Sequence, residues 1–211
     1  MERLESLAGQ VKQSNIAQSD DDVVICAAFR TPLTKAKKGG LKDTLPEVML
    51  ATVLRAVVDK VKLDPKKVED IVVGNVLQPG AGSNSSRWGE FLADFPETTT
   101  LMSVNRQCSS GLEACMTIAA KIKAGTIDIG IGAGVESMSL YDMQATVDPE
   151  KIAENVFEHE KARNCLVPMG VTSENVAEKF GVSKEKQNTF AFESHQKAYK
   201  AQQAGLFKGT C

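Results

Sequence analysis

The 211-residue sequence has no long hydrophobic run and almost no excess of either charge. Its apolar stretches fall well short of the roughly 20 residues that a helix needs to span a bilayer. The net charge of −2 gives no basic surface for nucleic acid or for an anionic membrane. A membrane span and a nucleic-acid partner are therefore not expected. Apolar content of 42% with 25% charged residues is typical of a globular protein.

Paired cysteines and clustered metal ligands are also missing. The five cysteines, at positions 26, 108, 115, 165 and 211, are scattered, and no Cys-x-x-Cys pair occurs. A zinc site or a redox dithiol is therefore not indicated, and no metal is expected. Reduced thiols outside the secretory pathway fit the pattern better than disulfides. Of the other thiols, Cys26 is predicted to lie in a buried strand and Cys115 to pack in the core.

Strand-like and helical segments alternate from residue 22 to residue 139. Apolar runs predict buried strands at 22–28 and 68–77, a β-prone segment predicts a third strand at 98–104, and a glycine-rich segment predicts a fourth at 127–133. Apolar periodicity predicts a helix at 46–61, a helical pattern predicts another at 112–123, and a short helix is expected at 83–92. This alternation indicates an α/β fold with a mostly parallel sheet covered by helices on both faces.

The pattern changes after Ser139, where no further strand is predicted. Helices are expected at 149–161, 171–180 and 183–203, the last one capped by Ser183. The sequence therefore predicts three parts: a flexible segment at 1–21, an α/β domain at 22–139 and a helical domain at 140–211.

Cys108 lies where the strand at 98–104 gives way to the helix at 112–123. At a helix N-terminus, unpaired backbone N–H groups and the helix dipole favour negative charge. The thiolate is the nucleophilic form of cysteine, so this position suits a catalytic nucleophile. The small residues Ser109, Ser110 and Gly111 leave room for a substrate carbonyl. Position alone also allows a buried, inert cysteine.

The run from Asn105 to Gly111 (Asn-Arg-Gln-Cys-Ser-Ser-Gly) resembles the nucleophile motif of the thiolases, specifically of their peroxisomal 3-ketoacyl-CoA branch. Further segments resemble thiolase motifs in family order. They are 23–32, 39–44, 74–82, 134–139 and 165–175. One such match is modest support, whereas several in order are highly specific.

The resemblance implies a fold and a reaction. The α/β part would be half of a five-layer arrangement, and residues 140–211 would be the helical loop domain that binds CoA. The implied reaction is thiolytic cleavage of 3-ketoacyl-CoA by CoA in fatty-acid β-oxidation, with acetyl-CoA and a shortened acyl-CoA as products. The resemblance also implies a homodimer. CoA would act as cosubstrate, with no bound cofactor.

The resemblance assigns roles to three residues. Cys108 would be the nucleophile that carries the acyl group, and its backbone N–H would be one oxyanion donor. Asn105 would hold the turn around the cysteine in place rather than touch substrate. Met169, in a Pro-Met-Gly turn, resembles a residue that lines the acyl-pantetheine tunnel, although an ordinary core methionine fits that position equally well.

The N-terminal segment carries a spacing that resembles a peroxisomal targeting signal. A basic-aliphatic pair, Arg3 and Leu4, precedes Gln10 and Val11, and on a helix these residues project to one side. Such a signal is an address read by an import receptor and implies a peroxisomal location.

Three motifs that thiolases carry beyond these segments are missing from the sequence. The family's Asn-Glu-Ala, Gly-His-Pro and Cys-x-Gly-x-Gly motifs do not occur, so the chain is expected to be truncated, without the C-terminal half. Two alternatives therefore stand beside the enzyme. One is a catalytically silent subunit that binds CoA or pairs with a full-length thiolase. The other is a condensing enzyme of the same superfamily, although the contexts of Cys108 and Met169 fit a thiolase better.

Overall fold

A computed structural model describes residues 19–143 and 148–209. These residues form two compact units, the first of which holds 19–28 and 44–136 and the second 29–43 and 137–209. The predicted targeting residues Arg3, Leu4, Gln10 and Val11 lie outside the described residues.

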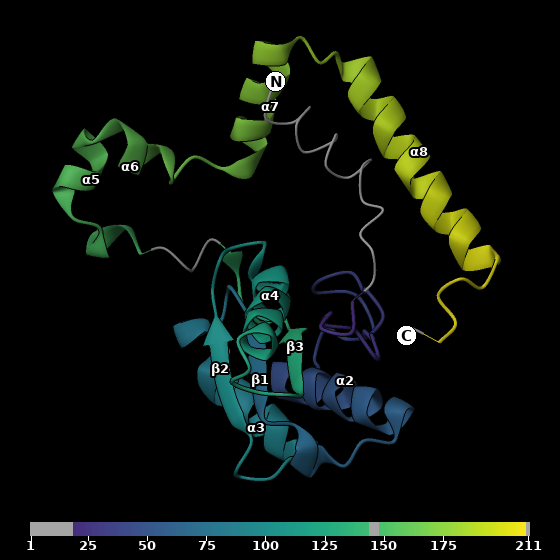
Figure 1. Ribbon diagram of the computed structural model, residues 1–211. Helices are drawn as coiled ribbons and strands as arrows, with labels where there is room; N and C mark the ends of the chain where they lie inside the picture. Colours follow the sequence, from purple (N-terminus) through teal and green to yellow (C-terminus); the bar gives the residue numbers. More distant parts are fainter. Residues whose placement is uncertain (1–18, 144–147, 210–211) are drawn as a thin grey trace. The chain divides into compact units, whose positions relative to one another are not determined.

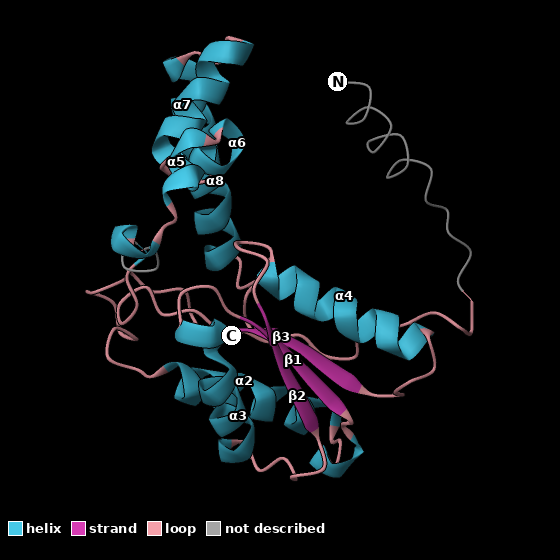
Figure 2. Cartoon of the chain, turned by 90° about the vertical axis from the view of Figure 1, so that its left-hand side faces the viewer, coloured by secondary structure: helices cyan, strands magenta, loops and turns pink. Residues whose placement is uncertain are grey.

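The first unit has three layers (Figures 1 and 2). A parallel sheet with the order β2-β1-β3 lies in the middle, formed by β1 (Asp70–Gly74), β2 (Thr100–Val104) and β3 (Gly130–Gly134). One face is covered by α2 (Pro46–Val61) and α3 (Ser83–Leu92), and the other by α4 (Ser110–Lys123). Short 3₁₀ turns at Pro65–Lys67 and Pro79–Gly82 flank β1. The predicted parallel α/β fold is confirmed.

The central strand β1 is buried along its whole length, because helices cover both of its faces. Its Ile71 and Val73 pack with Leu50 and Leu54 of α2, in a core that also takes in Phe95. The side chain between them, Val72, packs on the opposite face against Ala114 and Ile118 of α4. Burying one such side chain stabilises the fold by about 1.5 to 3 kcal/mol.

The predicted strand at 22–28 is wrong for this structure. Residues 22–28 form no strand, and Val24 and Ile25 are 70% and 84% exposed. An apolar run becomes a strand only when a neighbouring strand accepts its backbone hydrogen bonds. Within the described residues, neither edge strand of the sheet pairs with this segment. Cys26 is consequently exposed, so its predicted burial is wrong as well.

The second unit contains helices and no strand among its described residues. Its elements are η4 (Pro149–Lys151), α5 (Glu154–Glu158), α6 (Glu160–Asn164), α7 (Met169–Phe180) and α8 (Lys184–Gln203). None of the helices in the described ranges is long and apolar enough to cross a membrane.

The single helix predicted at 149–161 is wrong, because the backbone becomes extended at two points within it. Ala153 has φ −62° and ψ 139°, and His159 has φ −88° and ψ 111°. The His159 imidazole also caps α6, where its Nδ1 accepts a hydrogen bond from the Ala162 N–H at 3.3 Å. A side chain that bonds the local backbone competes with the continuous helix.

The turn between α7 and α8 follows the predicted local chemistry. Gly181 ends α7 in the left-handed conformation with φ 63°, which costs glycine little. Ser183 then begins α8, and its hydroxyl accepts a hydrogen bond from the Lys186 N–H at 3.2 Å. The predicted Ser183 cap is confirmed.

An ion pair within α3 also bonds the segment before β2. The Glu90 side chain is fully buried, and Arg87 Nη1 donates hydrogen bonds to its two carboxylate oxygens at 2.8 and 2.7 Å. The same nitrogen donates to the Thr99 carbonyl at 2.7 Å, and Arg87 Nη2 donates to the Glu97 carbonyl at 3.2 Å. Burial raises the pKa of Glu90 from its ordinary value, and Arg87 opposes that shift.

We expect Glu90→Gln to change how stability depends on pH. Because the pKa of Glu90 is higher in the folded protein than in the unfolded chain, the folded state binds more protons between those two values. The wild type therefore loses stability from this group as pH rises through that window. Urea unfolding from about pH 4 to about pH 7 should show the stability of Glu90→Gln rising relative to wild type. Parallel pH curves for the two proteins would contradict this assignment.

Candidate active site

The carboxyl ends of the three strands lie side by side at one end of the sheet. Gly74 of β1 is in register with Val104 of β2 and with Gly134 of β3. In open parallel sheets, ligands bind at the carboxyl ends of the strands. The segments that follow the carboxyl ends of the strands carry the polar residues Asn75, Asn105 and Glu136. The exposed Cys108 lies in the segment after β2, at the same end of the sheet.

Cys108 occupies a tight turn whose shape is held by side chains of its neighbours. The preceding residue, Gln107, has φ 50°, in the left-handed region that costs a residue with a side chain about 1 to 2 kcal/mol. Asn105 Oδ1 accepts a hydrogen bond from the Gln107 N–H at 2.9 Å. Ser109 Oγ donates to the Arg106 carbonyl at 2.8 Å. A strained residue persists only where the surroundings fix it, and this turn supplies such bonds.

Helix α4 begins directly after this turn, at Ser110 rather than at the predicted residue 112. The Ser110 hydroxyl donates to the Gln107 carbonyl at 2.5 Å and accepts from the Arg106 N–H at 2.9 Å. Arg106 also forms an ion pair with Glu113, with Nε and Oε2 3.1 Å apart. These contacts connect the cysteine turn to the first turn of α4, so Cys108 lies directly before a helix start. The neighbouring N–H groups of Ser109 and Ser110 donate to the Arg106 and Gln107 carbonyls.

A glycine lets the start of α4 lie directly on the end of β1. A Cβ added at Gly74 would lie 2.5 Å from the Ser110 carbonyl carbon and 2.6 Å from the Gly111 nitrogen. Real Cβ atoms do not approach backbone atoms so closely. Along the same helix, a Cβ at Gly132 of β3 would lie 2.6 Å from the Cys115 Cα. Glycines in two strands thus set the distance between the sheet and the helix that follows Cys108.

Glu136 follows β3, and its side chain holds the loop that leaves β1. Its carboxylate accepts hydrogen bonds from the Val76 and Leu77 N–H groups, at 3.0 and 3.3 Å. It also accepts one from Asn75 Nδ2 at 3.2 Å. The predicted strand bounds hid the signal, because Asn75 falls inside the predicted strand 68–77, whereas in the structure Asn75 and Glu136 follow β1 and β3 by one and two residues.

The predicted site residues fall in two places. Asn105 and Cys108 lie in the same turn of the first unit. Met169 belongs to the second unit, where it begins α7 with 67% of its surface exposed, so it is not a core methionine in this chain. Both His159 and His195 are exposed, also in the second unit.

Cys115 was predicted to pack in the core and is exposed instead. Its sulfur lies 3.8 Å from the Gly132 carbonyl oxygen. Since β3 is an edge strand of the described sheet, no further strand or helix layer encloses the thiol there.

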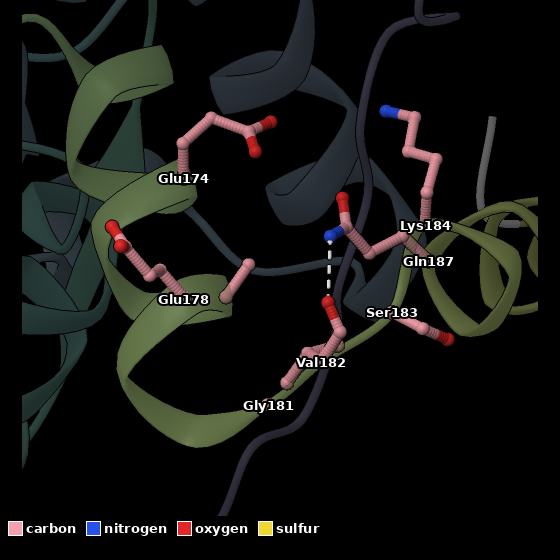
Figure 3. Close-up of a pocket in the computed structure, with 8 residues that line it drawn as sticks. Glu174, Glu178, Gly181, Val182, Ser183, Lys184 and Gln187 are labelled. Atoms are coloured by element: carbon pink, nitrogen blue, oxygen red, sulfur yellow. Dashed lines mark hydrogen bonds between the residues drawn. The ribbon is translucent and has the colours of Figure 1, made fainter.

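A surface hollow of about 530 Å³ lies between α7 and α8, around Gly181 and Ser183 (Figure 3). Glu174 and Glu178 border it on α7, and Lys184 and Gln187 border it on α8. None of the residues predicted to carry chemistry lines it. No group of three or more potential metal ligands is found among residues 19–143 and 148–209.

Comparison with known proteins decides the family. The family described as "Thiolase, N-terminal domain" matches residues 23–210. The chain belongs to the thiolase family. It is 54% identical over 187 residues to human peroxisomal 3-ketoacyl-CoA thiolase, covering 89% of this chain and 43% of that protein. It is also 54% identical over 191 residues to peroxisomal 3-ketoacyl-CoA thiolase 2 of Arabidopsis thaliana, covering 89% of this chain and 40% of that protein.

Solved thiolase structures agree with the fold. The dimeric peroxisomal thiolase of Saccharomyces cerevisiae superposes with a TM-score of 0.84 at 40% identity, covering 92% of this chain and 50% of the yeast chain. The acetyl-CoA acetyltransferase of Bacillus anthracis gives 0.72 at 29% identity, covering 90% of this chain and 50% of that chain. The predicted thiolase resemblance is confirmed, and this thiolase chain spans half the length of these relatives or less.

Proposed function

We propose that this chain supplies the nucleophile for thiolytic cleavage of 3-ketoacyl-CoA by CoA. The observation that carries the proposal is the position of Cys108. It is exposed, held in a strained and hydrogen-bonded turn, and adjacent to the start of α4 at the carboxyl edge of a thiolase sheet. Those features make the Cys108 thiol accessible to a substrate beside the start of a helix.

In the first half-reaction, the Cys108 thiolate attacks the 3-keto carbon of the substrate. A carbon–sulfur bond forms, and the bond between the α and β carbons breaks. The electron pair of that bond leaves as the enolate of acetyl-CoA, which takes up a proton to become acetyl-CoA. In the tetrahedral intermediate, the oxygen of the attacked carbonyl carries the negative charge, and we assign the Cys108 N–H as a hydrogen-bond donor to it.

In the second half-reaction, the thiol of CoA attacks the carbonyl of the acyl-Cys108 thioester. The shortened acyl group passes to CoA, and the Cys108 thiol is released. Exchange of one thioester for another is nearly balanced in energy, which is why a thiol suits this covalent route. No metal or redox group takes part in either step.

Other residues have supporting roles in the proposal. Asn105 positions the cysteine turn, consistent with its bond to the Gln107 N–H. Met169 is assigned to the acyl-pantetheine tunnel, and its exposure leaves it available for substrate. The helices of the second unit would contact CoA. A homodimer is proposed from the dimeric yeast relative.

The setting proposed for this activity is peroxisomal fatty-acid β-oxidation. The human, Arabidopsis and yeast relatives are named as peroxisomal thiolases. Import would depend on Arg3, Leu4, Gln10 and Val11 binding the peroxisomal import receptor.

The test of the proposal is the time course of acetyl-CoA release from a 3-ketoacyl-CoA. Without CoA, we expect one equivalent of acetyl-CoA per chain, because the acyl group stays on Cys108. Added CoA should convert this burst into turnover. A burst without turnover would favour a subunit whose acyl group must be released with the help of a partner. No release with or without a full-length thiolase present would contradict the proposal and leave the silent subunit.

A further inference from the structure

We propose that Glu136 is a positioning residue for the nucleophile, acting through the segment Asn75–Leu77 and through Asn105. The inference rests on the proposed role of Cys108. It concerns how the cysteine turn is held, and Glu136 itself has no contact with substrate in the proposal.

The Glu136 carboxylate is the point where three hydrogen-bond donors converge. Oε2 accepts from the Val76 and Leu77 N–H groups at 3.0 and 3.3 Å, and Oε1 accepts from Asn75 Nδ2 at 3.2 Å. Donors to a charged acceptor form stronger bonds than neutral pairs do. The carboxylate therefore fixes the loop that leaves β1 against the end of β3.

The fixed loop in turn contacts the cysteine turn. Asn105 Nδ2 donates to the Val76 carbonyl at 3.2 Å, so the Val76 residue is held by Glu136 at its N–H and by Asn105 at its carbonyl. The other end of the same amide, Oδ1, accepts from the Gln107 N–H at 2.9 Å. The Asn75 N–H also bonds the Val104 carbonyl at 3.1 Å, directly before this turn.

The connection ends at a residue that needs support. Gln107, immediately before Cys108, has φ 50° and is the strained point of the turn. The Asn105 amide can hold Gln107 only while the amide itself is fixed, and the bond to Val76 fixes it. Loss of the Glu136 bonds therefore loosens Asn105, then Gln107 and then the thiol.

A carboxylate with a different location provides a matched control. Glu69 is also exposed, and its Oε2 also accepts from two backbone N–H groups, those of Asp128 at 2.6 Å and Ile129 at 3.2 Å. It precedes β1, whereas Glu136 follows β3, so the two carboxylates lie at opposite ends of the same strand pair. Glu136→Gln and Glu69→Gln both remove one negative charge and disturb similar bonds.

The experiment measures alkylation of Cys108 by iodoacetamide, resolved by peptide mass spectrometry, as a function of pH. The rate at Cys115 of the same molecule is the internal reference. We expect Glu136→Gln to lower the Cys108 rate roughly 10-fold across the whole pH range, because a loosened turn no longer holds the thiol in place. Glu69→Gln should leave both cysteines unchanged, and Glu136→Asp, which keeps two acceptor oxygens, should restore part of the rate.

The sign of the change separates positioning from simple charge. Removing a negative charge favours a nearby thiolate, so a purely electrostatic role would make Cys108 react faster in Glu136→Gln. An unchanged or faster rate would overturn the inference, as would an equal loss in Glu69→Gln. If Glu136→Gln fails to fold, as judged by circular dichroism, Glu136→Asp is measured in its place. An unchanged or faster Cys108 rate in Glu136→Asp would then overturn the inference. If wild-type Cys108 is no more reactive than Cys115, the result counts against the proposed role of Cys108 as nucleophile. The effect of Glu136→Gln on the Cys108 rate can still be measured, so the positioning role is tested separately.

Discussion

Cys108→Ala is expected to abolish acetyl-CoA release from a 3-ketoacyl-CoA, with the single-turnover rate at least about 10³-fold below that of the wild type. The loss follows because no carbon–sulfur bond can form and the enolate has no route to leave. Rapid quenching and quantification of acetyl-CoA measure the effect.

Cys115→Ala is the matched control for this substitution. Cys115 is an exposed thiol on α4, seven positions after Cys108 in the sequence, and its sulfur contacts only the Gly132 carbonyl among the described hydrogen-bond partners. Its replacement should leave the rate unchanged. Equal loss in both variants, or retained release in Cys108→Ala, would contradict the assignment of the nucleophile.

Gly74→Ala is expected to have the largest effect on stability. The added Cβ would meet backbone atoms of Ser110 and Gly111 at 2.5 to 2.6 Å, so β1 and the start of α4 must separate. Overpacking of this kind costs about 3 kcal/mol, and here it also displaces the turn that carries Cys108. Urea unfolding should show a lower midpoint, and Cys108 should lose any excess reactivity over Cys115.

Gly111→Ala is the control for Gly74→Ala, because it also replaces a glycine but adds no close contact between β1 and α4. Nothing lies within 4 Å of a Cβ added at Gly111, which is already helical. Alanine there should stabilise the protein by about 0.5 to 1 kcal/mol, because it restricts the unfolded chain. If both variants were destabilised alike, the close approach of β1 and α4 would not be the cause.

Local patterns were sufficient for most of the fold. The periodicity of residues 46–61 predicted α2 with its observed bounds, and residues 83–92 likewise predicted α3. Helix α2 buries an apolar stripe, so its sequence carries the signal. Helix α3 buries Ser85, Ser86, Gly89 and Glu90 instead, while its Trp88, Phe91 and Leu92 are exposed. The prediction of a strand at 22–28 was wrong because an apolar run indicates only that a segment can be buried. Whether a neighbour buries it depends on tertiary pairing, which the local sequence does not contain.

The candidate site divides in the same way. Cys108 and Asn105 stand in one short motif, so their proximity could be read from the sequence. The Glu136 contacts join residues about 60 positions apart, since they depend on β1 and β3 being parallel neighbours. The left-handed Gln107 also escaped prediction, because glutamine has no preference for that conformation and the surrounding bonds impose it.

The most direct test of the role of Cys108 is to locate the acyl group on the protein. The chain would be incubated with a 3-ketoacyl-CoA in the absence of CoA, quenched in acid, digested and examined by peptide mass spectrometry. We expect one shortened acyl group, on the Cys108 peptide, that disappears when CoA is added. An acyl group on Cys26, Cys115 or Cys165 in its place, or no acyl group at all, would contradict the assignment of Cys108 as the nucleophile.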